Sequence, residues 1–195
     1  MVKLIGFNKK IKSAVFISGT GSNLKNLIQF SFLKKTNLDI SLIISNNPKA
    51  KGLNFAKKYK IKKKIVNYQN NKYAEKEILN AVNKSKIDLI CLAGFMKILS
   101  KDFIKKFKGK IINIHPSLLP KYKGLNTHKR VIKQKEKFSG CTVHFVNSRL
   151  DAGKIILQKK VKVSKKDTPK SLAKKILKQE HLLYRKAIKK IYSNF

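Results

Sequence analysis

The stretch NIHPSLLPKYKG at 113–124 carries two side chains that could do chemistry, Asn113 and His115. They end a short apolar run, and residues two apart on a strand face the same side. An amide and an imidazole aimed at one point suit the stabilisation of a developing negative charge and the transfer of a proton. The alternative is that His115 only forms structural hydrogen bonds, which is the commoner role of a histidine at a strand end. Pro116 and Pro120 stiffen the chain directly after it.

An acid that could pair with this imidazole is Asp151. The chain has only nine acidic residues, and Asp151 lies in RLDAG, a glycine-flanked loop between two apolar runs. A carboxylate in that loop could meet His115 across a cleft. It would then favour the imidazolium and raise the pKa of His115.

A glycine turn, ISGTGSNL at 17–24, opens an amphipathic segment directly after the first apolar run. Gly21 and the glycine two residues before it allow close approach of the backbone, and Ser22 or Asn23 can cap the helix. Free N–H groups at the positive end of a helix suit a phosphate. The turn is not a dinucleotide fingerprint, because Leu24 replaces its third glycine. The alternative is a turn that serves only strand-to-helix geometry.

The loop LAGFMKILS at 92–100 is too apolar for an ordinary exposed connection. It follows a strand-like run, and in open α/β sheets ligands bind outside the carboxyl ends of the strands. Met96, Ile98 and Leu99 are therefore either packed under a neighbouring segment or form the wall of a pocket for a flat apolar ligand.

Short apolar runs alternate with longer amphipathic segments along the first 115 residues, which predicts repeated strand–helix–strand units and a parallel sheet. After residue 124 two strands joined by a short loop can pair antiparallel. We therefore predict an α/β, Rossmann-like three-layer sandwich. The predicted strands lie at 15–18, 40–45, 64–68, 87–94, 110–115, 141–146 and 154–163, and the predicted helices at 21–34, 49–60, 72–84, 100–108, 126–136 and 168–193.

The net charge of +38 would by itself suggest a nucleic-acid partner. The chain has only three arginines, however, and its lysines are spread over every segment without an aromatic-rich basic patch of the sort that reads bases. This distribution indicates a compositional bias on solvated faces. A polyanionic partner is the alternative that stays open.

One globular domain over 1–195 is expected from the length, with residues 1–11 as a short N-terminal extension. No run of about 18 apolar residues occurs and no secretory signal is recognisable, so we expect a cytoplasmic protein with no membrane partner. Cys91 and Cys141 lie in separate apolar runs without metal-binding spacing, so we expect free buried thiols and no metal site.

Six motifs in the same order resemble one family, the folate-dependent phosphoribosylglycinamide formyltransferases. These motifs are ISGTGSNL, LAGFMKILS, NIHPSLLPKYKGLNTH, CTVHFV, LDAGKIILQ and QEH at 179–181, and the match runs from about residue 12 to 193. The resemblance implies a mostly parallel, seven-stranded sheet. It also implies transfer of a formyl group from the co-substrate 10-formyltetrahydrofolate to glycinamide ribonucleotide in purine biosynthesis.

The resemblance also implies roles for single residues. Asn113, His115 and Asp151 match the family's catalytic trio. The residues that match its ribonucleotide site are Gly21, Ser22, Asn23 and Glu180. Those that match its folate site are Met96, Lys97, Ile98, Leu99 and Asn113, together with the loop 148–153.

Two departures from the family concern the glutamate tail of the folate. The family commonly has an arginine in the region of Asn70-Asn71-Lys72, and Lys97 stands where the family often has another. A lysine keeps the charge but lacks the planar fork that grips a carboxylate. The hold on the tail is therefore the least defined part of the site.

Three other functions stay open at this stage. Methionyl-tRNA formyltransferases share the chemistry but differ after the first strand and add a C-terminal RNA-binding barrel. Formyltetrahydrofolate deformylases share the core but add an N-terminal regulatory domain, and few residues precede the first strand here. A basic, non-catalytic RNA-binding protein is the third alternative.

Overall fold

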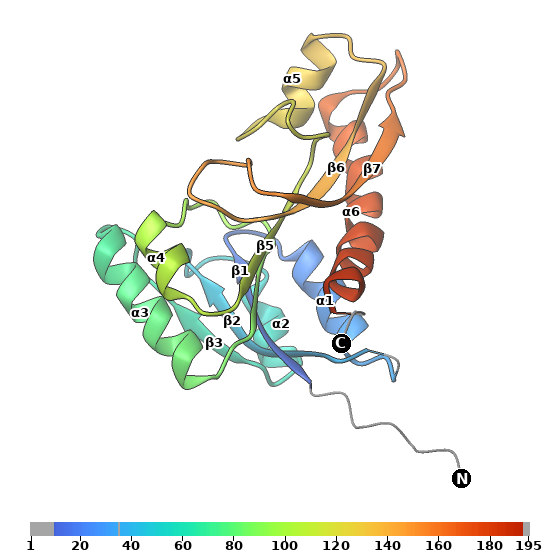
Figure 1. The fold of residues 1–195 in the computed structure, drawn as a ribbon. Helices are drawn as coiled ribbons and strands as arrows, with labels where there is room; N and C mark the ends of the chain where they lie inside the picture. The colour runs from blue at the N-terminus through green and yellow to red at the C-terminus, as the bar shows by residue number, and fades with distance from the viewer. Residues whose placement is uncertain (1–9, 35, 193–195) are drawn as a thin grey trace.

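The computed structural model describes residues 10–34 and 36–192. A single seven-stranded sheet in the order β3-β2-β1-β4-β5-β6-β7 crosses the molecule with helices on both faces (Figure 1). The strands are β1 (Ile11–Ile17), β2 (Leu38–Ser45), β3 (Lys62–Ile65), β4 (Leu89–Leu92), β5 (Lys110–His115), β6 (Phe138–Phe145) and β7 (Ile155–Lys162). The helices are α1 (Ser22–Ser31), α2 (Leu53–Lys58), α3 (Asn71–Lys84), α4 (Lys101–Lys106), α5 (Thr127–Lys133) and α6 (Pro169–Tyr192).

The first five strands are parallel to one another. Strand β6 pairs antiparallel with β5, and β7 pairs antiparallel with β6. The predicted fold class is therefore confirmed, including the antiparallel pairing of the last two strands. All seven predicted strands and all six predicted helices are present, with ends displaced by a few residues.

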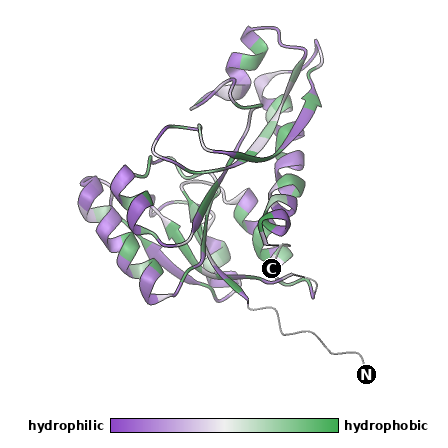
Figure 2. Cartoon of the chain, in the orientation of Figure 1, coloured by the Kyte–Doolittle hydropathy of each residue, from purple (hydrophilic) through white to green (hydrophobic). Residues whose placement is uncertain are grey.

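The core has two parts because the central strands are apolar on both faces. In β1, Val15 and Ile17 pack on the side of α1 and α6, whereas Ala14 and Phe16 pack on the side of α3 and α4. Figure 2 shows hydrophobic colour along the central strands, while the helices carry both colours. Helices that present one apolar stripe to such a sheet produce a three-layer sandwich.

Two loops meet where the order of the strands reverses, between β1 and β4. The N–H of Ser18 donates to the carbonyl oxygen of Gly94 at 3.0 Å, and the N–H of Met96 donates to the Ser18 hydroxyl at 2.8 Å. The glycine turn and the apolar loop thus lie side by side at the carboxyl ends of the strands, the usual place for ligands in this type of sheet.

Three smaller expectations have different outcomes. Cys91 and Cys141 are free and buried, as predicted. The N-terminal extension predicted over 1–11 is one residue too long, because Ile11 already belongs to β1 and pairs with Leu38. Residues 1–9 lie outside the described part of the chain. The helix cap predicted at Ser22 or Asn23 is also wrong: Gly21, at φ 73°, is the N-cap, and no side chain caps α1.

Helix α6 is fixed to the sheet by a buried hydroxyl. Tyr184 is fully buried, and its Oη lies 3.0 Å from the carbonyl oxygen of Leu92 in β4 and 3.3 Å from that of Ile112 in β5. This contact ties the longest helix to the two strands that carry the candidate site.

We predict that Tyr184→Phe lowers the free energy of unfolding by about 1 to 2 kcal/mol, because the strand carbonyls lose their donor. Thermal denaturation should show a melting temperature lower by a few degrees. Tyr73→Phe is the matched control, since Tyr73 is 64% exposed. Equal melting temperatures for the two variants would contradict this role of the hydroxyl.

Candidate active site

A cleft of about 770 Å³ opens at the carboxyl ends of β1, β4 and β5. Asn113, His115, Asp151 and Glu180 all line it, as does Asn23 of the glycine turn. Exposed apolar side chains form part of its wall, and these are Met96, Ile98, Leu125 and Leu150. The sequence placed catalytic, phosphate-binding and apolar groups in three separate motifs, and the fold brings them to one cavity.

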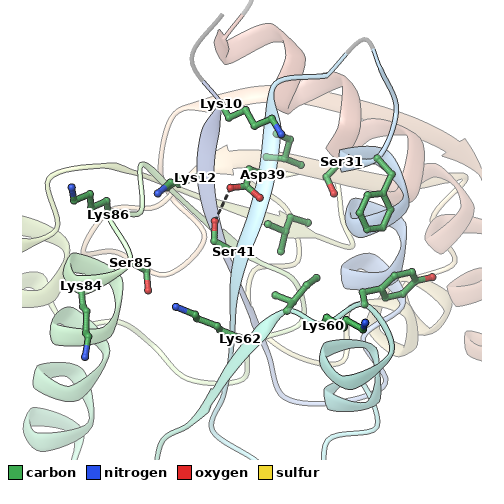
Figure 3. Close-up of a pocket in the computed structure, with 15 residues that line it drawn as sticks. Lys10, Lys12, Ser31, Asp39, Ser41, Lys60, Lys62, Lys84, Ser85 and Lys86 are labelled. Carbon is green, nitrogen blue, oxygen red and sulfur yellow. Dashed lines mark hydrogen bonds between the residues drawn. The ribbon is translucent and has the colours of Figure 1, made fainter.

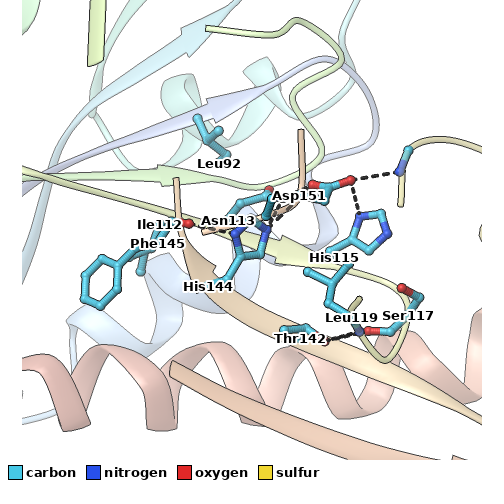
Figure 4. Close-up of polar contacts among 12 residues, drawn as sticks. Leu92, Ile112, Asn113, His115, Ser117, Leu119, Thr142, His144, Phe145 and Asp151 are labelled. Carbon is cyan, nitrogen blue, oxygen red and sulfur yellow. Dashed lines mark hydrogen bonds and ion pairs between the residues drawn. The ribbon is translucent and has the colours of Figure 1, made fainter. Parts of the chain in front are cut away.

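The carboxylate of Asp151 is the centre of the polar contacts in this cleft (Figure 4). Its side chain is only 8% exposed. Oδ2 accepts a hydrogen bond from the N–H of Gly124 at 2.8 Å and lies 3.3 Å from Nδ1 of His115. Oδ1 faces Nδ2 of Asn113 at 3.4 Å. The three predicted catalytic residues are thus in direct contact.

The amide of Asn113 is oriented by a fourth residue, His144 of β6. Nδ1 of His144 lies 2.7 Å from the carbonyl oxygen of Phe145, which can only accept, so Nδ1 carries a proton. With a neutral ring, Nε2 of His144 accepts from Nδ2 of Asn113 at 3.2 Å. Nε2 of His144 and Oδ1 of Asp151 are only 3.6 Å apart, so one N–H of Asn113 can be shared between them. The second N–H is left for a ligand.

The ring of His115 lies between two acceptors. Nε2 is 2.8 Å from the carbonyl oxygen of Tyr122, and Nδ1 faces Asp151. Burial nevertheless lowers the pKa of His115 below its ordinary value of 6.5, and the Tyr122 carbonyl and the Asp151 carboxylate, which raise it, compensate only in part. Asp151 thus raises this pKa as predicted, but the expected net rise is wrong, because the sequence does not reveal how deeply the ring is buried.

Asp151 itself is held in the charged form. Burial alone would raise the pKa of its carboxyl group, but the rings of His144 and His115 in their protonated forms, together with the N–H of Gly124, outweigh burial and lower the pKa. The site therefore combines a carboxylate that stays ionised with an imidazole that is neutral near neutral pH.

The chain that leaves His115 is braced by β6 and β7. The Thr142 hydroxyl donates to the carbonyl oxygen of Ser117 at 2.7 Å and accepts from the N–H of Leu119 at 3.1 Å. Gln158 donates to the carbonyl oxygen of Leu119 at 2.8 Å. The Leu119–Pro120 peptide bond in this turn is cis. These contacts, in addition to the prolines, fix the direction of the strand end.

At the other end of the cleft, the glycine turn meets helix α6. Asn23 donates from Nδ2 to Oε2 of Glu180 at 2.7 Å, and the Ser22 hydroxyl is 2.8 Å from Nε2 of His181. Burial raises the pKa of Glu180, and the hydrogen bond from Asn23 offsets this only in part. Because both side chains point to α6, the first-turn N–H groups of α1 are left without a side-chain cap. Such uncapped groups suit an anion.

A smaller pocket of about 90 Å³ adjoins the cleft and shares Asn113 and Asp151 with it. Its wall includes four of the five predicted folate residues, Asn113 together with Lys97, Ile98 and Leu99, opposite Arg149 and Leu150. Met96 lies in the larger cleft instead. Lys97 and Ile98 line both cavities, so the five residues lie together at their boundary, and their contact with a folate stays a prediction.

Comparison with known proteins agrees with this geometry. Residues 11–188 match the family model described as formyl transferase. The phosphoribosylglycinamide formyltransferase of Haemophilus influenzae is 41% identical over 91% of this chain and 85% of its own length. The solved phosphoribosylglycinamide formyltransferase of Brucella melitensis is 39% identical, with a TM-score of 0.89 over 94% of this chain and 96% of that one.

The chain belongs to the formyl transferase family. It is also 40% identical, over 95% of its length, to the human trifunctional purine biosynthetic protein adenosine-3, but it spans only 19% of that protein. The phosphoribosylglycinamide formyltransferase from Anaplasma phagocytophilum is a further structural relative, with 43% identity and a TM-score of 0.87 over 93% of this chain and 86% of that one.

Sequence reasoning missed two histidines of this formyl transferase site. His144 lies within CTVHFV, which reads as a core strand, and the signal was its alternation with Cys141 and Val143, which places it on the other face of β6. His128 lines the cleft, and its Nδ1 is buried without a hydrogen-bond partner among residues 10–34 and 36–192.

Two further findings concern the described residues only. No helix within them has both the length and the apolar character needed to cross a membrane. No three histidine, cysteine, aspartate or glutamate side chains in that part of the chain converge in a way that could hold a metal ion.

We predict that His115 titrates below pH 6.5, and that Asp151→Asn moves its midpoint lower still by removing the negative charge beside it. The chain has four histidines, so NMR titration of ring-labelled protein can follow each one. A wild-type midpoint above 6.5, or an upward shift in the variant, would contradict the geometry described here.

Proposed function

We propose that this chain transfers a formyl group from 10-formyltetrahydrofolate to the amine of phosphoribosylglycinamide in purine biosynthesis. The observation that carries the proposal is the convergence of Asn113 and His115 on Asp151, at the junction of the large cleft and the smaller apolar pocket. Two substrates can meet only where two binding spaces share a boundary. This boundary carries a hydrogen-bond donor, a titratable base and a carboxylate.

The reaction begins when the amine nitrogen attacks the formyl carbon, so that the carbonyl becomes a tetrahedral oxyanion. The free N–H of Asn113 donates to that oxygen, and donors placed where charge develops lower the barrier most. The new negative charge also raises the pKa of His115, whose two acceptors are already in place. His115 therefore takes up the proton that the attacking amine releases, through a water held by Asp151.

Collapse of the intermediate completes the transfer. The bond between the formyl carbon and N10 of the folate breaks, the carbonyl re-forms, and the proton on His115 passes to N10. One proton has then moved from the amine to the folate, and His115 is neutral again. Asp151 stays ionised throughout, since its lowered pKa keeps it charged at every step.

The ribonucleotide is proposed to lie along the cleft between the glycine turn and Asp151. Its phosphate would meet the first-turn N–H groups of α1 at Gly21, Ser22 and Asn23. Glu180 accepts from Asn23 through Oε2, so its other oxygen can accept from the glycinamide amine. This assignment orients the amine toward the formyl group.

The folate is proposed to place its pterin in the smaller pocket, against Ile98 and Leu99. Lys97 and Arg149 are the lysine and arginine of that wall. The ammonium of Lys97 lies 5.7 Å from the centre of the Tyr68 ring and already has that contact. The planar guanidinium of Arg149 can instead bind a carboxylate of the glutamate tail with two hydrogen bonds. Arg149 would thus take over part of the role of the arginines that the family has elsewhere.

We predict that His115→Ala and Asp151→Asn each lower kcat for formyl transfer by about a hundredfold or more, because a group that acts on the oxyanion or its proton is lost. Product formation is measured with both substrates saturating, and circular dichroism confirms that the variants fold. Asp102→Asn is the control, since Asp102 is exposed on α4 away from the cleft. Wild-type turnover in either site variant would sink the assignment.

A second prediction concerns the folate tail. Arg149→Ala should raise KM for 10-formyltetrahydrofolate about two- to fivefold with little change in kcat, a modest effect because the side chain is exposed. Arg149→Lys should recover only part of the loss. A folate analogue without the glutamate carboxylates should show no difference between the proteins, and an equal KM change for that analogue would refute this contact.

A further inference from the structure

A second large cavity lies at the opposite edge of the sheet from the catalytic cleft. It measures about 610 Å³, is open to solvent, and is bordered by the amino ends of β1, β2 and β3 together with the turn before β4 (Figure 3). Because parallel strands share one direction, everything at their amino ends is remote from the site at their carboxyl ends. The proposed formyl transfer makes no use of this cavity.

Lysines are concentrated around this cavity beyond the general bias of the chain. Six of its fifteen lining residues are lysines, whereas lysine and arginine together make up 47 of the 195 residues of the chain. All six are exposed, and none forms an ion pair within the described residues. They are Lys10, Lys12, Lys60, Lys62, Lys84 and Lys86. Ammonium groups gathered without partners around a hollow attract a compact, multiply charged anion.

The remaining lining residues indicate what else the anion carries. Phe32 is 65% exposed, and its ring lies 5.8 Å from that of Tyr59, so two aromatic faces border the cavity. Asp39, the one acidic residue of the lining, accepts from the Ser41 hydroxyl at 3.0 Å. Aromatic faces suit a heterocyclic base. Asp39 alternates with Leu38 and Ile40, which pack on the same side of β2 as Tyr59, so its carboxylate faces the other side of β2 from the two rings.

We propose that this cavity binds a nucleoside polyphosphate, with its phosphates among the lysines and its base against Phe32 and Tyr59. The volume is that of a site for one small ligand. A strand of RNA would need a continuous groove with successive stacking faces, and this cavity offers one aromatic pair. The proposal does not depend on the formyl transfer, since the two sites use different residues.

The test is calorimetric binding of ATP, AMP and inorganic tripolyphosphate to the whole chain at physiological salt. ATP should bind at least tenfold more tightly than AMP, which lacks two phosphates, and than tripolyphosphate, which lacks the base. Lys62→Gln combined with Lys86→Gln should weaken ATP binding at least tenfold. The matched control is Lys133→Gln combined with Lys137→Gln, which removes the same charge at α5 and the start of β6 and should change binding less than twofold.

Phe32→Leu supplies an independent readout of the base. It should weaken ATP at least threefold and leave tripolyphosphate unchanged. Three results would overturn the proposal. The two double variants could lose ATP affinity equally, ATP and tripolyphosphate could bind with equal affinity, or an oligouridylate could bind through Lys62 and Lys86 where ATP does not. Because His115→Ala should bind ATP as wild type does, the result stands whether or not that variant has lost formyl transfer.

Discussion

The need to satisfy one buried carboxylate, that of Asp151, organises the candidate site. A buried ionised carboxylate is costly unless it is paired and hydrogen-bonded. Here the backbone N–H of Gly124, the ring of His115 and the amide of Asn113 supply its partners, the first from the loop before α5 and the other two from β5. The same contacts that make the charge tolerable also aim the amide and the imidazole at one point. Stability and chemistry therefore depend on the same set of contacts.

The loop that carries Asp151 is held in place by its own backbone. Asp151 has φ 46°, a left-handed conformation that few residues other than glycine adopt readily. Two residues later, a Cβ on Gly153 would lie 1.7 Å from the carbonyl oxygen of Phe145, so only glycine allows the loop to close against β6. The glycine in the sequence DAG thus serves the position of the carboxylate. The topology then places this loop above β5, and the lysine-lined cavity lies at the far edge of the sheet.

Much of this arrangement follows from the sequence, and the failures have physical causes. Continuous apolar runs marked the buried strands, and a spacing of two was enough to place Asn113 and His115 on one face. His144 was missed because a histidine in an apolar strand looks like core until its pairing with Asn113 is known. The prediction that Ser22 caps α1 failed because the Ser22 hydroxyl bonds to His181, a residue 159 positions away in the chain. The net direction of the pKa shift of His115 was predicted wrongly because the burial of its ring is a property of the whole fold.

The central claim is that the formyl group leaves the folate only for the amine of the ribonucleotide. Consumption of 10-formyltetrahydrofolate by the purified chain, followed with and without glycinamide ribonucleotide, tests it most directly. We predict consumption that requires the ribonucleotide and yields one formylated product for each folate consumed. Consumption at the same rate without the ribonucleotide would mean that water is the acceptor, and it would contradict the account.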